Sequence, residues 1–151
     1  MLRKLLVTAT ATAVALATGI AVADVKPEDA IRYRQGILMG LGWNVGPMGA
    51  MVKGEIPFDK EKFAFYAERA AALAPMFPEG FTPGSDKGET GAKPELWENR
   101  ADFDQRAKDV AAATAKLAEV ARGGDEGAMK AQFGETVKVC KGCHDEYREK
   151  E

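Results

Sequence analysis

The sequence predicts an all-α fold, an antiparallel four-helix bundle, for the chain that follows residue 23. First, nothing after residue 24 resembles a strand, because alanine is abundant, Val, Ile and Thr are thinly spread and no hairpin dipeptide separates alternating apolar runs. Second, four segments carry apolar residues at helical spacing, and two of them are long and heptad-spaced. Third, one sizeable crossover loop follows the second segment, as in many helical bundles.

Residues 1–23 have the three parts of a secretory signal peptide. Arg3 and Lys4 precede an uncharged stretch at residues 5–20, and a small-residue cleavage site follows at residues 21–23. The uncharged stretch is too short, and too rich in Thr and Ala, for a permanent membrane span. We therefore expect export to an oxidising compartment, the bacterial periplasm, and one mature domain over residues 24–151.

Charge and cysteine content exclude several classes of protein. The chain carries 21 basic and 23 acidic residues, and two of the basic residues lie in the signal, so the mature domain has a net charge of −4. An acidic domain without a basic run is a poor candidate for binding nucleic acid. No other segment is apolar for long enough to cross a bilayer, so no stable membrane association is expected. Two cysteines are too few for a disulfide-stapled scaffold.

The first helix is predicted to begin at Pro27, with Glu28 and Asp29 placed to complement the helix dipole. Its expected apolar seam is Ile31, Leu38, Leu41, Val45, Met48 and Val52. Arg34 lies on this seam, where a guanidinium needs either an anionic partner or a route to solvent for its head. Five glycines between residues 36 and 49 indicate that something bulky approaches this helix closely, and Pro47 is expected to bend it.

A second helix is predicted to start near Asp59, a candidate N-cap, and to be ended by Pro75 and Pro78. Residues 78–93 form the crossover loop, which is rich in Gly, Pro, Ser and Asp.

Pro94 begins a third helical region, which we expect to break near Asn99 and to stop at the glycine pair 123–124. Its expected seam is Leu96, Phe103, Ala107, Val110, Thr114, Leu117 and Ala121. The fourth helix has Asp125 as its candidate cap. Its expected face is Met129, Phe133, Thr136, Val137, Cys140, His144 and Tyr147.

The fourth helix ends in a C-x-x-C-H motif, Cys140-Lys141-Gly142-Cys143-His144, which is the attachment signature for c-type haem. Two thiols on one helical turn can each bond a vinyl group on the same edge of the macrocycle, and the imidazole at the next position then lies beneath the iron. These are the only cysteines and the only histidine of the chain. We therefore predict one covalently attached haem c, with Cys140 and Cys143 as its attachment points and His144 as its iron ligand.

Three other uses of the motif fit less well. A thioredoxin-like redox pair needs a preceding strand in a βαβ setting, which the sequence lacks. A structural zinc would have three good ligands here and would need a fourth, such as Asp145. A disulfide between Cys140 and Cys143 would leave the adjoining His144 without a role.

The sixth coordination position of the iron has two interpretations at this stage. No second histidine exists, so any second ligand must come from an upstream helix. A methionine ligand would give a six-coordinate electron carrier with a raised potential, although core packing is the commoner role of methionine. The candidates in the mature chain are Met39, Met48, Met51, Met76 and Met129.

Three segments together resemble cytochrome c′, namely residues 26–35, residues 94–97 and the run from Cys140 to Arg148. The resemblance spans the mature chain and is most specific at the C-terminal motif. It implies a four-helix bundle, usually a homodimer, with five-coordinate, largely high-spin haem and His144 as the sole axial protein ligand. Ordinary class I cytochromes c instead place the motif near the start of the chain and a methionine ligand well downstream.

The same resemblance implies roles for individual residues. Arg34 and Gln35 match residues in the region of a haem propionate, which would also supply the anion that a guanidinium on an apolar seam needs. Leu38 matches the apolar residue that covers the distal face. Arg148 matches a basic residue on the proximal side, near the histidine. Trp43 is expected to lie in the core or in a subunit contact.

The expected function is the binding of small gases. A free coordination position covered by Leu38 has no hydrogen-bond donor, which favours the neutral ligands NO and CO over O₂. The alternative is an electron-transfer cytochrome c with a redox partner protein, in its sharpest form a low-spin protein with Met39 as ligand. Met39 is turned about 100° from Leu38 around the helix, so both cannot face the iron. A haem enzyme is not expected, because acid–base catalysis above the iron needs a group that can donate or accept a proton, and Leu38 has none.

Overall fold

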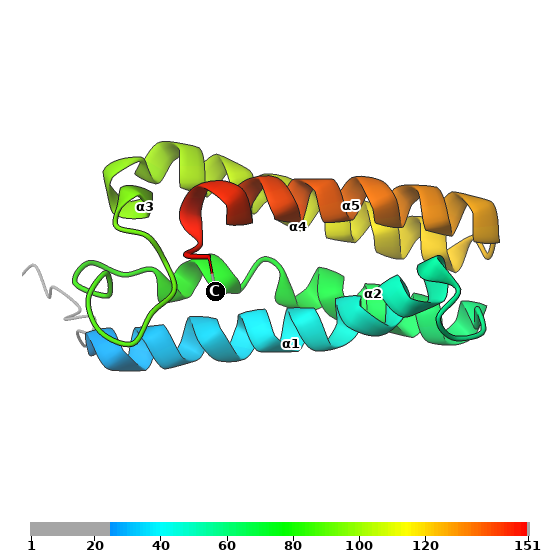
Figure 1. The fold of residues 1–151 in the computed structure, drawn as a ribbon, viewed down its shortest axis with the longest axis horizontal. Helices are drawn as coiled ribbons and strands as arrows, with labels where there is room; N and C mark the ends of the chain where they lie inside the picture. Colours follow the sequence, from blue (N-terminus) through cyan, green and yellow to red (C-terminus); the bar gives the residue numbers. More distant parts are fainter. Residues whose placement is uncertain (1–24, 151) are drawn as a thin grey trace, which may run out of the picture.

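The computed structural model describes residues 25–150, which form the predicted all-α bundle (Figure 1). The four long helices are α1 (Pro27–Lys53), α2 (Lys60–Leu73), α4 (Arg100–Arg122) and α5 (Glu126–Tyr147). The connection between α2 and α4 contains a 3-10 turn, η1 (Phe77–Gly80), and the short helix α3 (Glu95–Glu98). Residues 25–150 contain no strand, and none of their helices is long and apolar enough to span a membrane. The predicted signal peptide lies outside the described residues.

The helix ends confirm the predicted caps. The Asp59 carboxylate accepts a hydrogen bond from the Lys62 backbone N–H at 2.9 Å, and the Asp125 carboxylate accepts one from the Ala128 N–H at 2.6 Å. Each bond satisfies a backbone donor that the first turn of a helix leaves unpaired. α1 stops at Gly54, whose φ of 75° lies in the left-handed region that favours glycine.

The third helical region breaks where the sequence predicts. Asn99 has φ −109° and ψ 42°, outside the helical range, and separates α3 from α4. Every residue of the expected seam is buried, namely Leu96, Phe103, Ala107, Val110, Thr114, Leu117 and Ala121. α4 therefore supplies a continuous apolar stripe to the core.

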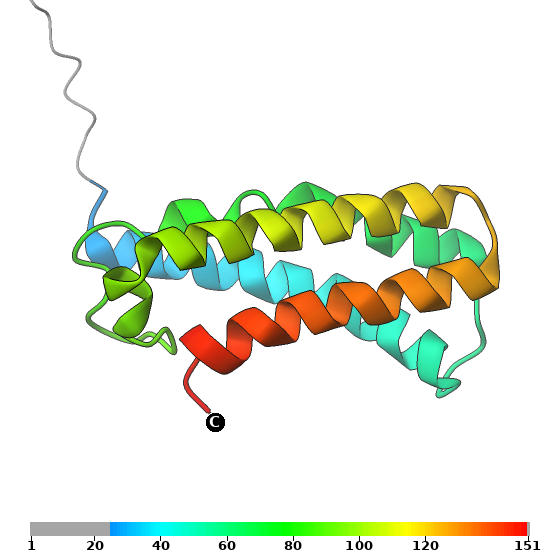
Figure 2. The same cartoon turned by 90° about the horizontal axis from the view of Figure 1, so that it is seen from above.

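The long helices close around the core except along one edge. α1 packs on α2, α2 on α4 and α4 on α5, whereas α1 and α5 make few contacts with each other. All four run along the long axis of the molecule (Figure 2). The core forms two apolar clusters, one around Phe63 and Phe133 and the other around Phe77 and Phe103. The edge between α1 and α5 is the least closed part of the bundle.

The buried stripe of α1 differs from the expected seam. Ile31 and Met48 are buried as expected, but Leu38 is 38% exposed and the other three members are half-buried. The buried residues of α1 are Ala30, Ile31, Arg34, Asn44, Met48 and Met51. The seam was wrong at Leu38 because α1 packs on α2 and η1, which leaves a side chain on its other flank only partly covered.

The expected face of α5 is also buried only in part. Its buried members are Met129, Phe133, Thr136 and Tyr147. Val137 and His144 are exposed, Cys140 is half-buried, and Cys143 is buried in their place. The reason is the same as for α1: α5 has α4 on one side and the open edge on the other, so one face cannot be covered throughout.

The glycines of α1 mark a close approach at one position. A Cβ at Gly40 would lie 3.1 Å from Leu73 Cδ1, so α2 comes close to α1 there. Apart from the neighbouring residues and backbone of α1 itself, no described atom comes within 4 Å of a Cβ at Gly36, Gly42 or Gly46. α1 continues as a helix through Pro47.

Candidate haem-binding site

The predicted attachment motif occupies the last turns of α5. Cys143 is buried in the same core cluster as Phe103 and Tyr147, and Cys140 is half-buried at the edge of that cluster. Both are free thiols, and burial raises the pKa of each. The two sulfur-bearing residues therefore share one helix end, and the disulfide alternative is not present in this structure.

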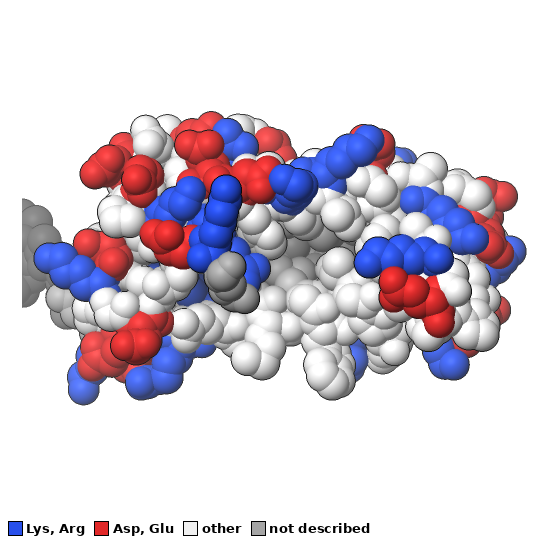
Figure 3. Space-filling model, in the orientation of Figure 1, with Lys and Arg blue, Asp and Glu red and all other residues white. Residues whose placement is uncertain are grey.

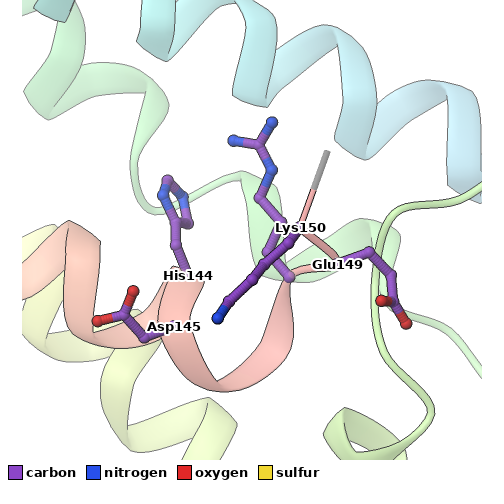
Figure 4. Close-up of a pocket in the computed structure, with 5 residues that line it drawn as sticks. His144, Asp145, Glu149 and Lys150 are labelled. Carbon is purple, nitrogen blue, oxygen red and sulfur yellow. The ribbon is translucent and has the colours of Figure 1, made fainter.

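His144 lines a hollow of about 290 Å³ together with Asp145, Arg148, Glu149 and Lys150. Its imidazole projects from α5 towards α1, while Asp145 and Glu149 point to either side (Figure 4). Partial desolvation and the positive charge of Arg148 lower the pKa of His144. A lowered pKa favours the neutral imidazole, which is the form that ligates a metal.

A hollow lies in the middle of the face between α1 and α5 (Figure 3). Its visible walls are uncharged, and both basic and acidic side chains stand along its rim. It follows the edge where α1 and α5 make few contacts. Uncharged walls suit a flat, largely apolar macrocycle, and the thiols and imidazole of α5 suit its attachment. The residues present therefore fit haem c.

Arg34 is 2% exposed and is bonded to the crossover loop. Its Nη1 donates to Gly80 O and to Ser85 Oγ, and its Nη2 donates to Ser85 O, all at 2.8 Å, and Nη2 also donates to Thr90 Oγ1 at 2.7 Å. Burial lowers the pKa of its guanidinium.

These four acceptors are uncharged, so the expected anionic partner of Arg34 is not among them. Two aromatic rings compensate in part, because the guanidinium carbon lies 4.5 Å from the Phe81 centroid and 5.4 Å from the Trp97 centroid. Carbonyl, hydroxyl and π contacts together explain how the charge is buried. The propionate role of Arg34 stays a prediction.

The other predicted residues lie on α1 or directly after α5, the two helices that flank the open edge. Gln35 Nε2 donates to Glu89 O at 2.8 Å, so this side chain also binds the crossover loop. Leu38 follows one turn later on α1 and is partly exposed. Arg148 lines the hollow beside His144, and its backbone N–H donates to His144 O at 3.1 Å.

The candidate methionine ligands lie elsewhere. Met48, Met51 and Met129 are buried in the core cluster with Phe63 and Phe133, not in the cluster that contains Cys143. The remaining two, Met39 and Met76, are 73% and 37% exposed. Among the described residues, no methionine belongs to the apolar cluster around Cys143.

Sequence reasoning missed a polar clasp that holds the motif to α4. Tyr147 Oη donates to Asp102 Oδ2 at 2.6 Å, and Arg106 Nε donates to the same oxygen at 2.6 Å. Arg106 Nη1 also donates to Gly142 O, inside the motif, at 3.3 Å. The four-residue spacing of Asp102 and Arg106 signals an ion pair on α4, but no local signal points to Tyr147 or Gly142.

Comparisons with known proteins agree with this geometry. The chain matches the family described as Cytochrome C′ over residues 29–148. A cytochrome c′ of Halomonas halodenitrificans is 41% identical over 129 residues, which cover 82% of this chain and 98% of that protein.

Two solved structures cover a similar share of the chain. A variant of cytochrome c prime from Alcaligenes xylosoxidans, in complex with nitric oxide, has a TM-score of 0.76 at 35% identity and covers 83% of this chain and 98% of its own. A cytochrome c′ with an unusual ligand-controlled dimer dissociation has a TM-score of 0.78 at 34% identity, with shares of 85% and 100%.

The family match runs from the first turn of α1 to the residue after α5, and includes the attachment motif. Haem c is the cofactor of this family, and the two cysteines of the C-x-x-C-H motif are consistent with its attachment. The chain therefore belongs to the cytochrome c′ family.

Proposed function

We propose that this chain is a periplasmic mono-haem cytochrome that binds NO and CO at a five-coordinate haem iron. The observation that carries the proposal is the set of metal ligands that the site offers. His144, the single histidine of the sequence, lines the hollow at the end of α5. No methionine among residues 25–150 joins the cluster that holds Cys143, which supports one axial protein ligand over two.

The residues at the end of α5 would each hold a different part of the cofactor. When bound, the haem supplies an iron with a coordination position for a diatomic gas. Cys140 and Cys143 fix the macrocycle to α5, and His144 holds the iron from one side. Arg148 places a positive charge beside the imidazole and so favours its neutral, ligating form.

The residues of α1 would shape the opposite side of the site. Leu38 presents an apolar side chain with no proton to donate, which suits neutral NO and CO and gives O₂ no hydrogen bond. Arg34 and Gln35 hold the crossover loop at the propionate edge through bonds to Thr90 and Glu89. The activity is ligand binding rather than catalysis, because Leu38 has no acid or base group.

The nitric oxide complex of the Alcaligenes xylosoxidans relative supports NO as a ligand. That protein shares 35% identity with this chain over nearly its whole length. Export to the periplasm is supported by the basic, apolar and small-residue segments of residues 1–23.

We also propose that the chain acts as a homodimer, through the outer face of α1 and α2. Met39 and Trp43, four residues apart on α1, are 73% and 75% exposed, and Phe65 on α2 is 50% exposed. Exposed apolar side chains of this size on neighbouring helices mark a protein contact. The relative with ligand-controlled dimer dissociation supports a second copy as the partner.

The test is the electronic spectrum of the purified protein, oxidised, reduced, and reduced with CO, NO or O₂. We expect a five-coordinate, high-spin spectrum that changes with CO and NO, and no stable O₂ complex. A six-coordinate spectrum before any gas is added would refute the proposal. Mass spectrometry of the C-terminal peptide gives a separate check, because a missing porphyrin adduct on Cys140 and Cys143 would remove the cofactor assignment itself.

Met39→Leu separates gas binding from the electron-transfer alternative. The side chain of Met39 is 73% exposed on the outer face of α1, so we expect the spectrum of this variant to equal that of the parent. A shift from low-spin to high-spin absorption on substitution would show instead that Met39 is an iron ligand.

A further inference from the structure

The crossover loop connects α2 to α4 in the chain and is hydrogen-bonded to both helices that flank the open edge of the bundle, α1 and α5. α1 carries Leu38 and α5 carries His144, yet these helices make few contacts with each other. The distance between α1 and α5, the two walls of the open edge, therefore depends on the segments that contact both helices. The crossover loop is bonded to α1 at one place and to the end of α5 at another.

Arg34 makes the connection to α1. Its guanidinium donates to Gly80, Ser85 and Thr90, so one buried side chain holds two parts of the loop. The approach is close, because a Cβ at Gly80 would lie 2.6 Å from the Cβ of Arg34. Only glycine fits at that position without moving α1.

The backbone that follows α5 makes the second connection. The Lys93 N–H donates to Tyr147 O at 3.0 Å and the Glu149 N–H donates to Gly91 O at 2.8 Å, so residues 91–93 pair with residues 147–149 as a short antiparallel bridge. The middle residue of that bridge, Arg148, donates its own N–H to His144 O. The loop is thus two hydrogen bonds away from the iron ligand.

Thr90 connects these two attachments. Its hydroxyl oxygen accepts from Arg34 Nη2 at 2.7 Å and from the Ala92 backbone N–H at 3.1 Å. Ala92 is the residue that faces Arg148 in the bridge. One hydroxyl therefore links the buried guanidinium of α1 to the segment that pairs with the turn after His144.

We propose that Thr90 is a positioning residue that fixes the α1 wall relative to the His144 turn and thereby limits how readily a gas passes between them. The inference rests on the proposed gas-binding function. Without the Thr90 hydroxyl, Arg34 keeps its bonds to Gly80 and Ser85, and the bridge keeps its backbone bonds. Each attachment then remains, but the two are linked only through the backbone of the loop, so the opening between α1 and the His144 turn widens more often.

The first experiment compares Thr90→Val with Thr90→Ser, by flash photolysis of the CO complex of the reduced haem protein. Valine keeps the shape and removes the hydroxyl, and serine restores it. For Thr90→Val we expect CO association and dissociation to be faster by about three- to tenfold, with an equilibrium affinity within about twofold of the parent, because an entry barrier and not the bound state is altered. Thr90→Ser should behave as the parent.

The same loop offers a matched control. Thr82 has a buried hydroxyl oxygen with no hydrogen-bond partner among residues 25–150, so Thr82→Val makes the same chemical change without removing a bond seen there. We expect its CO kinetics to equal those of the parent. If Thr90→Val binds CO at the parent's rate, or if Thr82→Val accelerates binding as much, Thr90 has no positioning role.

A second experiment needs no substitution and applies even if Thr90→Val fails to retain haem. If opening between α1 and the His144 turn limits CO entry, low concentrations of urea that speed the amide hydrogen exchange of Lys93 and Glu149, the two donors of the bridge, should also speed CO association. The amide of Lys62, at the capped start of α2, serves as the reference for exchange that is unrelated to entry. A CO association rate that stays constant while exchange at Lys93 and Glu149 rises would overturn the role of Thr90, whereas a protein that binds no CO would overturn the proposed function instead.

Discussion

Leu38 shows how a single side chain can affect ligand entry more than stability. It lies one turn after Arg34 on α1 and is 38% exposed, so it contributes less to the core than a buried leucine. Its bulk beside the open edge is nevertheless in the path of a gas if the proposed function holds. Leu38 is therefore expected to affect the rate of gas entry more than the free energy of unfolding.

Leu38→Ala is expected to speed CO association without unfolding the protein. Removing the apolar lid lowers the entry barrier, and about 1.4 kcal/mol corresponds to a tenfold faster rate. The loss of unfolding free energy should stay below the roughly 2–5 kcal/mol of a buried leucine, because the side chain is partly exposed. Stopped-flow CO mixing and denaturant titration measure the two quantities.

Leu41→Ala provides the comparison, since Leu41 packs against both core clusters. It should lower stability more than Leu38→Ala and accelerate CO less. If Leu38→Ala leaves the CO rate unchanged, Leu38 does not cover the binding position.

At the residue scale, what the sequence predicts depends on whether the chemistry is local. The roles of Cys140, Cys143 and His144 can be predicted from the sequence because haem attachment requires neighbours at fixed spacing. Arg34 could be identified as an unusual charge on an apolar seam, but its partners could not, because Gly80 and Thr90 lie 46 and 56 residues further along the chain. Long-range polar contacts leave no periodic signal.

At the element scale, the last turn of α5 depends on its clasp to α4. Tyr147 is buried, and its hydroxyl donates to the Asp102 carboxylate, which also accepts from Arg106. Burial and then the hydrogen bond to Asp102 raise the pKa of Tyr147 to about 12. The clasp therefore ties the helix end that carries His144 to its neighbour, and it does so best while the phenol keeps its proton.

Tyr147→Phe is expected to destabilise the protein at neutral pH by about 1 kcal/mol, the net value of one hydrogen bond. An unfolded tyrosine ionises near pH 10, below the folded pKa of about 12, so the unfolded state releases its proton first as the pH rises. The parent's stability therefore falls with pH above about 10, and the phenylalanine variant lacks this dependence.

Denaturant titrations of both proteins at about pH 8 and about pH 11 measure the difference in free energy of unfolding. The gap between parent and variant should narrow at the higher pH. A gap that stays constant would show that Tyr147 ionises equally in the folded and unfolded chains. Asp102, Arg106 and Glu146 are the charged groups that act on the phenol.

Element boundaries were predictable where a cap or breaker decides them, and less so where packing does. Asp59, Asp125 and Asn99 mark their boundaries through local hydrogen bonding and backbone angles, and each prediction is confirmed. The buried stripe of α1 was not predictable at Leu38, because the seam alone does not say which flank of a helix is left without a neighbour.

At the scale of the whole molecule, the bundle leaves two apolar regions uncovered. One is the open edge between α1 and α5, where the proposed cofactor lies. The other is the outer face of α1 and α2, where a groove of about 350 Å³ is lined by Asn44, Arg69, Ala72 and Leu73. The fold class and helix order followed from the sequence, but the second region did not, since exposure is a property of the assembled bundle.

Trp43→Glu is expected to convert the proposed dimer to a monomer. Trp43 is 75% exposed on α1, next in sequence to Asn44, whose side-chain oxygen is buried in the structure without a hydrogen-bond partner. A second copy seated on this face would cover the indole, and tryptophan is a common energetic centre of such contacts. Placing a carboxylate there should weaken association by roughly thirtyfold or more.

Ile56→Glu, at an exposed residue between α1 and α2, should leave association unchanged. Sedimentation equilibrium over a range of protein concentrations measures the association. A parent protein that sediments as a monomer would contradict the proposed dimer. A Trp43→Glu variant that dimerises as strongly as the parent would show that the contact lies on another face.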